Sequence, residues 1–595
     1  MKFNKLCAFL DKIEKTSSRN AITIQLSSVL KILDTNEIKQ FCYLVTGKIV
    51  SNHQQIEFNF SEKLVEKSLE ELINEFNLRK TLDLKKLKYE IGDIGEIAKQ
   101  IREQIYSTPT VEHNINDIYS FLIQFSQVQG KNSVQQKKYM FKKMIVDTEP
   151  INAKFLTRII LGQMRTGFTE KTFLDAISIL LNGDKSLRNN LDIYYGYCSD
   201  IGTVTENLIS TQRRNESITN ILNEASPQPL IPILPKLVER EVNVQNITKR
   251  IENVIVQPKL DGIRGQIHKK DNIVKIFSRG LEDITNQFPE IATEILNAKI
   301  DSVILDCEII GFDFEKQQFL TYQETIKRKR KFDIDLFSIT IPTVAMCFDI
   351  IYFNGSNLAN KQLRERINLL TELFTIHNLT YLRLLETKEF NNESDIQTYF
   401  ENIIANNLEG IIAKNPNSFY IPGTRNFDWI KLKSNTVENY VDTIDVVTMG
   451  YYLGKGNRSK FGFGAILVGV YDEENDCYTT IGKIGSGFSE EEMNTIFKDL
   501  QKISITEKPQ NYLVDKSLYP NVWTEPKIVL EIQADEITVS PLHTACRNIL
   551  SKGGNLRGLS VRFPRLKVWK RDKILPNTTK EIFEMYKLQK SSKKI

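Results

Sequence analysis

A lysine followed closely by a carboxylate, a glycine and an arginine occurs in the run Lys259-Leu260-Asp261-Gly262-Ile263-Arg264. A neutral lysine amine can attack phosphorus, glycine lets the backbone approach a ligand closely, and arginine pairs with phosphate oxygens. Only roughly one free lysine in a thousand is neutral at pH 7, so neighbouring cations or a metal ion must favour the neutral form. By itself the run is also typical of an ordinary lysine between a strand and a turn.

Two further lysines alternate with apolar residues in Ile430-Lys431-Leu432-Lys433. Because side chains alternate across a β-strand, both ammonium groups would face one side while the apolar pair packs inward. Such a pair of cations could hold a phosphate. An exposed amphipathic edge strand gives the same pattern, so the pattern alone leaves both interpretations open.

Two glutamates and a phenylalanine complete the set of candidate residues. Glu308 and Glu409 each lie at the end of a predicted strand, where a carboxylate could meet ribose hydroxyls or Mg²⁺. Either could instead be a structural partner of an arginine. Phe348 offers a flat face to a nucleobase, although an aromatic residue inside the apolar run 344–353 is more often part of a core.

The elements that must position these residues change in character along the chain. The first 220 or so residues are mostly helical in pattern, and apolar residues at helical spacing predict helices at 61–76 and 173–181. Four spaced prolines, Pro227, Pro229, Pro232 and Pro235, then predict an extended, semi-rigid connection. We therefore place a domain boundary between residues 226 and 227.

Short β-branched runs alternate with helical patterns from residue 251 to 433, which predicts an α+β domain. After residue 434, strand patterns separated by glycine-rich turns predict a small β-barrel. The expected fold is an all-α N-terminal domain (1–226), an α+β domain (227–434) and a β-barrel domain (435–595). The strands expected in the last two lie at 254–256, 273–277, 303–308, 344–353, 446–452, 463–468 and 478–482.

Size and charge agree with a multidomain protein that meets nucleic acid through local patches. The chain has 595 residues with 41% hydrophobic content, and 79 Lys plus Arg against 74 Asp plus Glu give a net charge of only +5. No window approaches a membrane span, so no membrane partner is expected. The seven cysteines are scattered without a C-x-x-C pair, which supports neither a zinc finger nor a disulfide framework and favours a reducing intracellular compartment.

Several segments, in order, resemble the motifs of the covalent nucleotidyltransferases, and specifically of ATP-dependent DNA ligases of the archaeal and eukaryotic replicative type. These segments are 259–264, 277–283, 305–308, 347–355, 409–414, 429–433 and 560–565. Residues 149–167 are similar to the signature of the ligases' N-terminal DNA-binding domain, and 577–586 to their terminal segment. The β-barrel resembles the ligases' OB-fold. The resemblance covers nearly the whole chain.

This resemblance implies a three-step reaction. Lys259 attacks the α-phosphorus of ATP, pyrophosphate leaves, and a lysyl-AMP remains. The adenylate passes to a 5′-phosphate, and a 3′-hydroxyl then attacks that phosphate while AMP departs. Such an activity serves DNA replication, recombination, repair and cell division, and it uses Mg²⁺.

The resemblance also implies which residues contact the nucleotide and the metal. Phe348 would stack on adenine, and Glu308 would reach the ribose. Strand alternation places Asp306 on the same face as Glu308, where we expect it one layer further from the nucleotide. Lys259 is the catalytic residue. The nucleotide contacts are Gln257, Arg264, Arg279, Glu308, Phe348, Arg425, Lys431 and Lys433, and the metal ligands are Glu308 and Glu409.

Gln257 departs from the family pattern, because many of these ligases carry a glutamate two residues before the nucleophile. That glutamate helps to recognise the adenine amino group. Glutamine presents both a donor and an acceptor, so it can still read adenine but is less exclusive. The strictness of the preference for ATP is therefore left open by the sequence.

The expected partner is nicked duplex DNA, contacted through its backbone by a monomer that encircles it. Lys154, Arg158 and Arg165 are expected near phosphates, as are the basic stretches 327–331 and 455–460. Read alone, each of these is also a solvated surface. The basic C-terminal residues resemble the motif that orients the departing pyrophosphate, and read alone they are a basic barrel surface or a DNA-facing one. They are Arg562, Arg565, Lys570, Arg571 and Lys573. No clear sliding-clamp motif is present, and a clamp is left open as a partner.

Two alternatives remain at this stage. An RNA ligase or a GTP-using capping enzyme shares the lysine motif and the OB-fold, but the N-terminal helical domain and the run 562–565 argue against it. A nick-binding scaffold without activity is disfavoured because the lysine motif and its partner lysines are intact.

Overall fold

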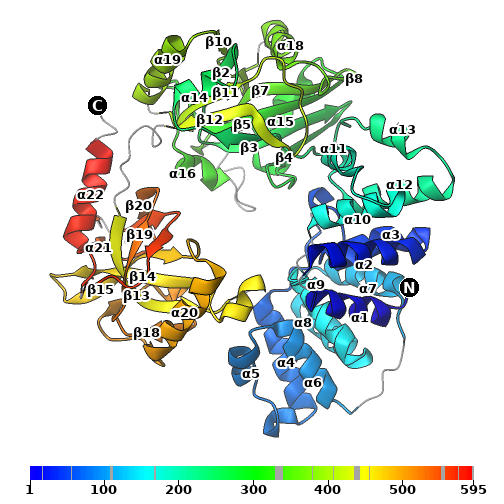
Figure 1. Ribbon diagram of the computed structural model, residues 1–595, viewed down its shortest axis with the longest axis vertical. Coiled ribbons are helices and arrows are strands. Elements are labelled where there is room, and N and C mark those ends of the chain that lie inside the picture. Colours follow the sequence, from blue (N-terminus) through cyan, green and yellow to red (C-terminus); the bar gives the residue numbers. More distant parts are fainter. Residues whose placement is uncertain are drawn as a thin grey trace. The chain divides into compact units, whose positions relative to one another are not determined.

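The computed structural model describes all of the chain except residues 17, 55, 107–111, 167–168, 329–339, 378, 407, 434–442, 455, 551–556, 574 and 592–595. Two compact units are present (Figure 1). One consists of Met1–Leu82 with Ala98–Glu438, and the other of Asp83–Ile97 with Asn439–Ile595.

Helices joined by turns and loops make up the described part of the N-terminal region, apart from one isolated bridge between Lys2 and Asn114. The two predicted helices are confirmed, because residues 61–76 contain α4 and residues 173–181 lie in α10. Helix α9 shows typical end signals, with Pro150 at its first turn and Gly162 in a left-handed conformation (φ 65°) after its last residue. The helices are α1 (Phe3–Glu14), α2 (Arg19–Ile32), α3 (Thr35–Val45), α4 (Glu62–Glu75), α5 (Leu84–Ile91), α6 (Ile94–Gln104), α7 (Ile115–Gln127), α8 (Ser133–Asp147), α9 (Pro150–Leu161), α10 (Glu170–Asn182), α11 (Arg188–Cys198), α12 (Ile201–Arg213) and α13 (Ile218–Asn223).

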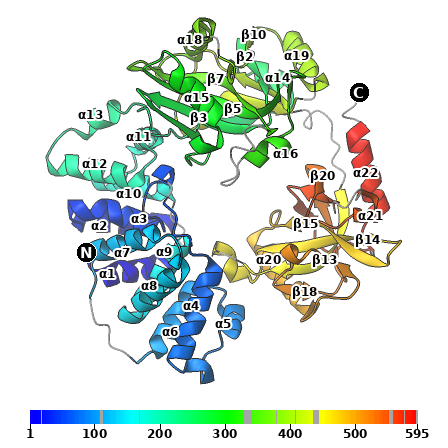
Figure 2. The ribbon, with the colours of Figure 1, turned by 180° about the vertical axis from the view of Figure 1, so that it is seen from behind.

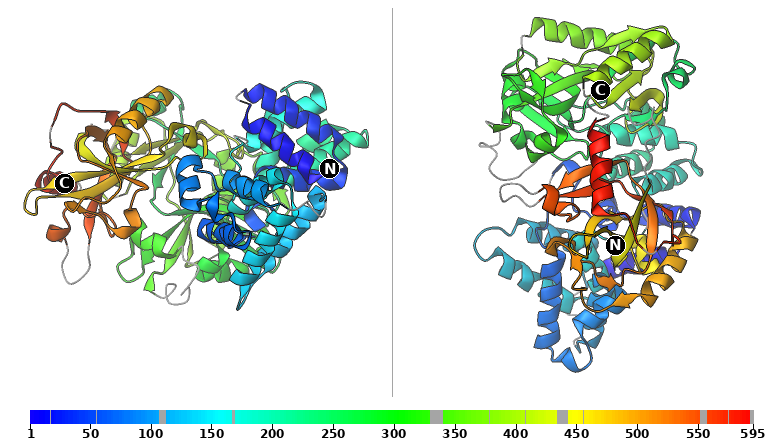
Figure 3. Two further views of the ribbon diagram at one scale, coloured as in Figure 1. Left: turned by 90° about the horizontal axis from the view of Figure 1, so that it is seen from below. Right: turned by 90° about the vertical axis from the view of Figure 1, so that its left-hand side faces the viewer.

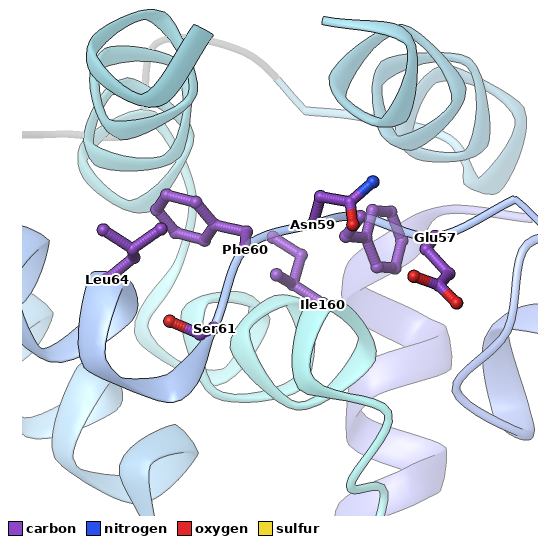
Figure 4. A pocket seen from close by; sticks show the side chains of 7 residues that line it. Glu57, Asn59, Phe60, Ser61, Leu64 and Ile160 are labelled. Carbon is purple, nitrogen blue, oxygen red and sulfur yellow. The ribbon is translucent and has the colours of Figure 1, made fainter. Parts of the chain in front are cut away.

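A hollow of about 410 Å³ lies in this helical region (Figure 4). It is lined by residues 57–61, with Leu64 of α4 and Ile160 of α9. None of the predicted site residues borders it. No helix in the described ranges is long and apolar enough to cross a bilayer.

The predicted α+β domain is confirmed and contains two sheets (Figure 2). The five-stranded sheet has the order β1-β12-β11-β2-β10, and the seven-stranded sheet runs β4-β3-β5-β7-β8 with β6 and β9 attached. The strands are β1 (Leu237–Arg240), β2 (Val254–Lys259), β3 (Ile263–Lys270), β4 (Ile273–Ser278), β5 (Ser302–Asp313), β6 (Gln318–Phe319), β7 (Thr343–Phe353), β8 (Ser356–Asn357), β9 (Leu382–Leu384), β10 (Lys388–Phe390), β11 (Gly410–Lys414) and β12 (Arg425–Lys433).

Helices cover the outer faces of both sheets. Helices α14 (Val244–Thr248) and α19 (Glu393–Ala405) pack on the five-stranded sheet through a core that includes Val254, Val256 and Ile411. Helices α15 (Pro289–Asn297) and α18 (Leu363–Ile376) pack on the seven-stranded sheet. The other faces of the two sheets share a third core, which joins Trp429 of β12 to Ile304 and Ile351. The residues between the sheets are therefore the ones that can form a site.

The proline-rich segment is not extended throughout as expected, because a hydrogen-bonded turn at residues 228–231 places Leu230 at a φ of 72°. The segment is hydrogen-bonded to the α+β domain. We call residues 227–236 the strap. The amide of Ile233 donates to Oε1 of Gln266 (3.0 Å), and Nε2 of Gln266 donates to the carbonyl of Ile233 (2.7 Å). The amide of Leu230 donates to Nδ1 of His268 (3.2 Å), whose pKa burial lowers to about 3. Ser199 of the helical region donates to the carbonyl of Pro232 (2.6 Å), so the strap joins both regions.

The second unit contains the predicted barrel, which confirms the OB-fold expectation. Its main sheet has the order β16-β18-β13-β14-β15-β17, and β19 joins β13 to β22. Helix α22 (Thr579–Ser591), red in Figure 3, contributes Ile582 and Tyr586 to the barrel core. The other elements are β13 (Thr443–Tyr452), β14 (Ala465–Asp472), β15 (Cys477–Ile484), α20 (Glu490–Lys502), β16 (Ser504–Ile505), β17 (Tyr512–Leu513), β18 (Val522–Thr524), β19 (Val529–Gln533), β20 (Glu536–Ser540), α21 (Arg547–Leu550), β21 (Gly558–Arg562) and β22 (Arg565–Val568).

Candidate nucleotide site

Strand alternation gathers the predicted lysines on the inner face of the five-stranded sheet. In β2, Val254 and Val256 pack under α14 and α19, so Gln257 and Lys259 face the other way. The same alternation applies to β11 and β12. The register then produces one row of Gln257, Ile412 and Lys431, and a second row of Lys259, Gly410 and Lys433.

Gly410 makes the second row possible, because it stands between the two lysines. Its φ is 151°, and a β-carbon there would lie 2.1 Å from the carbonyl oxygen of Leu432. With no side chain at this position, Lys259 and Lys433 can both reach the same carboxylate.

That carboxylate is Glu409, which forms ion pairs with Nζ of Lys259 and Nζ of Lys433. Burial alone would raise the pKa of Glu409, but the charges and hydrogen bonds of the two lysines outweigh burial and lower it. Glu409 is therefore an ionised carboxylate held between the predicted nucleophile and a predicted phosphate ligand.

Glu308 lies in a drier environment than Glu409. Its Oε1 accepts a hydrogen bond from the amide of Gly262 (3.1 Å). Burial raises the pKa of Glu308 to about 7, although the positive charges of Lys259 and Arg264 oppose the rise. A β-carbon at Gly262 would lie 2.5 Å from the carbonyl oxygen of Ile309, so this glycine allows close approach to β5. The sequence predicts instead that this glycine lets the backbone approach a ligand.

Arg264 is anchored by protein groups. Its Nε and NH2 donate to the two oxygens of Asp306 (3.0 and 2.7 Å), and its NH1 donates to the carbonyl of Lys236 in the strap (2.8 Å). Tyr420 also donates to Asp306 (2.8 Å). Asp306, expected behind Glu308, is thus the buried partner that orients Arg264.

Phe348 is half-buried between the two sheets, and cations lie over its ring. Nζ of Lys414 is 4.6 Å from the ring centroid, and the guanidinium carbon of Arg264 is 5.6 Å from it. Lys414 is fully buried, and burial lowers its pKa to about 7 despite nearby Asp349 and Asp306. Sequence reasoning missed Lys414, although the alternation of Gly410, Ile412 and Lys414 would have placed it on this face.

The remaining cations gather around Lys431. Burial, the charges of Lys433 and Lys259, and then those of Arg240 and Arg425 all lower the pKa of Lys431. Arg240 of β1 lies beside Lys431 in the register and was not identified from the sequence. The feature of the sequence that could have indicated Arg240 is the short strand that follows the prolines.

Arg279 is exposed in the turn after β4 and takes part in none of these contacts between described side chains.

Comparison with known proteins identifies the chain. Three family models match in order: "DNA ligase N terminus" at 2–178, "ATP dependent DNA ligase domain" at 235–433 and "ATP dependent DNA ligase C terminal region" at 459–573. A "Probable DNA ligase" of Dictyoglomus turgidum is 36% identical over 604 residues, covering 100% of this chain and 99% of the relative. A "DNA ligase" of Sulfurisphaera tokodaii is 33% identical, with 99% and 98% covered. The chain belongs to the ATP-dependent DNA ligases.

Structural comparison agrees with this family at the level of the fold. The solved structure titled "Pmar-Lig_PreS3" has a TM-score of 0.55 to this ligase and is 15% identical to it, with 95% of this chain and 99% of that chain covered.

Two of the predicted DNA contacts in the ligase's helical region are wrong. Lys154 and Arg158 are 4% and 3% exposed, and each pairs with Glu14 of α1 at 2.9 Å. Lys154 also pairs with Asp11 (2.9 Å). Helix α9 is buried from Asn152 to Ile160, so its cations hold it to α1 and are not available to phosphates. Arg165 is partly exposed and stays a predicted contact, whereas Gly167 lies outside the described residues.

The two basic stretches of the ligase also contain structural arginines. Arg328 is 2% exposed and donates to the carbonyl of Gln287 (2.7 Å) and to Glu290 (2.8 Å). Arg458 donates to the carbonyls of Gly464 and Gly485. The prediction for Arg328 is wrong for the same reason as above, whereas Arg458 is partly exposed and stays a predicted contact. Residues 329–331 and Lys455 lie outside the described ranges, and Lys327 and Lys460 stay predicted contacts.

The C-terminal basic motif of the ligase remains exposed. Arg562 and Arg565 lie on either side of a tight turn in which Phe563 has a φ of 51° and is 61% exposed. Their ion pairs, with Glu536 (3.8 Å) and Asp535 (3.7 Å), are long. Beyond the turn, Lys570 pairs with Asp499, and both Arg571 and Lys573 pair with Asp445.

Proposed function

We propose that this enzyme seals nicks in duplex DNA, joining a 3′-hydroxyl to a 5′-phosphate, with Lys259 as the residue that carries AMP. The observation that supports this most directly is the cluster of three lysines, Lys259, Lys431 and Lys433, on one sheet face with Glu409 among them. A nucleophilic amine and two cations within reach of one phosphate are what adenylyl transfer from ATP requires.

In the first step, the amine of Lys259 forms a bond to the α-phosphorus of ATP while the bond to pyrophosphate breaks. Charge grows on the non-bridging oxygens, and Lys431 and Lys433 offset it. In the second step, the nitrogen–phosphorus bond is exchanged for a bond to the 5′-phosphate oxygen of the nick. In the third, the 3′-hydroxyl attacks that 5′-phosphorus and AMP leaves.

The other site residues bind the nucleoside in this proposal. Phe348 and Ile412, both partly exposed between the sheets, give apolar surfaces to the adenine. Glu308, whose pKa of about 7 keeps part of it protonated, can both donate to and accept from a ribose hydroxyl. Arg264 and the exposed Arg279 are assigned to the ribose and the phosphates, and Arg425, exposed at the start of β12, is assigned as a further contact of the nucleotide.

Mg²⁺, the metal of this ligase family, fits the carboxylates of the site. Mg²⁺ takes one or two protein carboxylates and completes its shell with water and phosphate oxygens. In the described ranges no group of three or more His, Cys, Asp or Glu side chains is arranged for a metal, so a site shared with phosphate is the one that fits. We assign Glu308 and Glu409 to it. Bound there, Mg²⁺ supplies positive charge opposite the phosphate oxygens.

For partners, we propose nicked duplex DNA held by a monomer that encircles it inside the cell, with domains 1–226, 227–434 and 435–595. The second boundary falls within residues 434–442, which the structure does not describe. The match to the model of the ligase N terminus, with the exposed Arg562 and Arg565, favours duplex DNA over an RNA or cap substrate. A sliding clamp remains an additional candidate partner.

Labelling with α-³²P-ATP and Mg²⁺ tests the nucleophile. We expect one labelled band after denaturing electrophoresis and its loss in Lys259→Ala. The unchanged enzyme should also seal a nicked duplex, whereas Lys259→Ala should not. Lys316→Ala, an exposed lysine of the same domain, is the matched control and keeps both activities. A label that persists in Lys259→Ala would overturn the assignment, and α-³²P-GTP with a nicked RNA substrate would reveal the alternative activity.

A further inference from the structure

The side-chain amide of Gln257 is held in one orientation by two neighbours. Its Nε2 donates to Oγ1 of Thr387 (2.9 Å) and to the backbone carbonyl of Phe348 (3.3 Å). A carbonyl oxygen only accepts hydrogen bonds, so the nitrogen of the amide, and not its oxygen, must face Phe348.

Thr387 adds a second constraint through its own hydroxyl proton. Oγ1 of Thr387 donates to the carbonyl of Leu385 (3.0 Å), so toward Gln257 the hydroxyl presents a lone pair. Rotating the amide by 180° would set its oxygen against two acceptors. Thr387 lies between β9 and β10, and β10 pairs with β2, which explains why it is adjacent to Gln257.

The other end of the amide is left without a partner. Gln257 is 1% exposed, and no donor among the described residues reaches its Oε1. A buried acceptor without a donor is unfavourable, and a ligand that brings a donor removes this cost. Gln257 stands on the Lys259 face of the sheet, beside Ile412 and close to Phe348, where the base is proposed to bind.

We infer that Thr387 is a positioning residue that fixes Oε1 of Gln257 toward the base, so that the site selects purines with an amino group at C6 and rejects 6-oxo purines. The inference rests on the proposed function and deepens it. The glutamine would then be as exclusive as a carboxylate, because the donor end of its amide is engaged elsewhere. Inosine and guanosine triphosphates present a lone pair to Oε1, whereas ATP presents a hydrogen.

Three triphosphates separate this effect from general binding: ATP, ITP and purine riboside triphosphate, which has no group at C6. The readout is kcat/KM for formation of the lysyl-nucleotide. For the unchanged enzyme we expect ITP to be poorer than ATP by about 30-fold or more, with purine riboside triphosphate between them.

Thr387→Val removes the acceptor but keeps the shape, and Thr387→Ser keeps the acceptor. In Thr387→Val the ATP-to-ITP ratio should fall by about tenfold, because the amide can turn, while Thr387→Ser should retain the ratio. Equal losses for all three triphosphates in Thr387→Val would mean a merely structural role and would overturn the inference.

Sealing of a pre-adenylated nick without nucleotide is the folding control, because that step does not read a free base. Should Thr387→Val fail this control, Gln257→Leu gives the second test. It should lower kcat/KM for ATP to the level of purine riboside triphosphate, and a retained preference for ATP would overturn the inference. Labelling of the unchanged enzyme by ATP and ITP alike would contradict this inference only. Absence of any label would contradict the proposed function itself.

Discussion

Glu308 and Glu409 are carboxylates of one site with opposite electrostatic surroundings. The pKa of Glu409 is lowered because two lysines pair with it, whereas burial raises the pKa of Glu308 to about 7. Environments that separate two pKa values in this way allow one group to remain an anion while the other keeps a proton. The difference follows from contacts between residues as far as 150 positions apart in the chain, so it could not be read from the sequence.

The raised pKa of Glu308 has a measurable effect on stability. Its folded pKa lies above the ordinary value of 4.5, so the folded state loses stability as the pH rises from 4.5 to about 7, and the loss is complete above that. Glu308→Gln removes this loss. The free energy of unfolding of Glu308→Gln should exceed that of the unchanged enzyme by little at pH 4.5 and by about 3 kcal/mol at pH 8.

Urea unfolding of both proteins in EDTA, followed by tryptophan fluorescence at the two pH values, checks this prediction. Glu315→Gln, at an exposed position of the same domain, is the control and should show no pH-dependent difference. If Glu308→Gln raised the free energy of unfolding equally at both pH values, the raised pKa of the buried Glu308 carboxyl would be contradicted.

At the scale of elements, side-chain alternation and the order of the motifs predicted most of the inner face of the five-stranded sheet. Lys431 and Lys433 lie on one face of their strand as expected, because side-chain direction in a strand follows directly from residue parity. The strand expected at 254–256 continues to Lys259. Arg240 was missed because its place beside Lys431 depends on strand pairing between segments far apart in the chain. Alternation gives the face of Lys414, but its contact with the ring of Phe348 depends on the other sheet. The same limit explains the wrong predictions for Lys154, Arg158 and Arg328. In the sequence, a lysine or arginine in an amphipathic segment looks exposed until its partner carboxylate is located.

The buried Arg158 of α9 and the exposed Arg565 of β22 lead to opposite predictions. Arg158→Met breaks the pair with Glu14 on α1, which keeps Lys154 as a partner, and should destabilise the helical region by about 2 kcal/mol. Because Arg158 is buried, the dependence of DNA affinity on salt should not change. Arg565→Met, at an exposed position, should leave stability unaltered and reduce the slope of log affinity against log salt by about 1.

Thermal unfolding and DNA titrations at several salt concentrations measure both effects. A reduced salt slope for Arg158→Met would restore this residue as a phosphate contact.

At the scale of the whole molecule, the ligase consists of two compact units, and the proposed mechanism requires it to enclose a duplex. We expect the radius of gyration from small-angle scattering to fall when nicked duplex is added, and to change less with an intact duplex of the same length. An identical scattering envelope with and without nicked DNA would exclude closure around the substrate.

The strap also determines how the chain should respond to a protease. Its backbone is bonded to Gln266 and His268, and the side chain of its one lysine, Lys236, is fully buried against Asp428. A protease cleaves a stretch of chain that can leave the protein surface and enter the active-site cleft of the protease. The hydrogen bonds and the buried lysine hold the strap in place, so the strap cannot do this. Brief trypsin digestion should therefore leave the helical region and the nucleotide-binding sheets on a single fragment, even though a run of prolines separates them in the sequence.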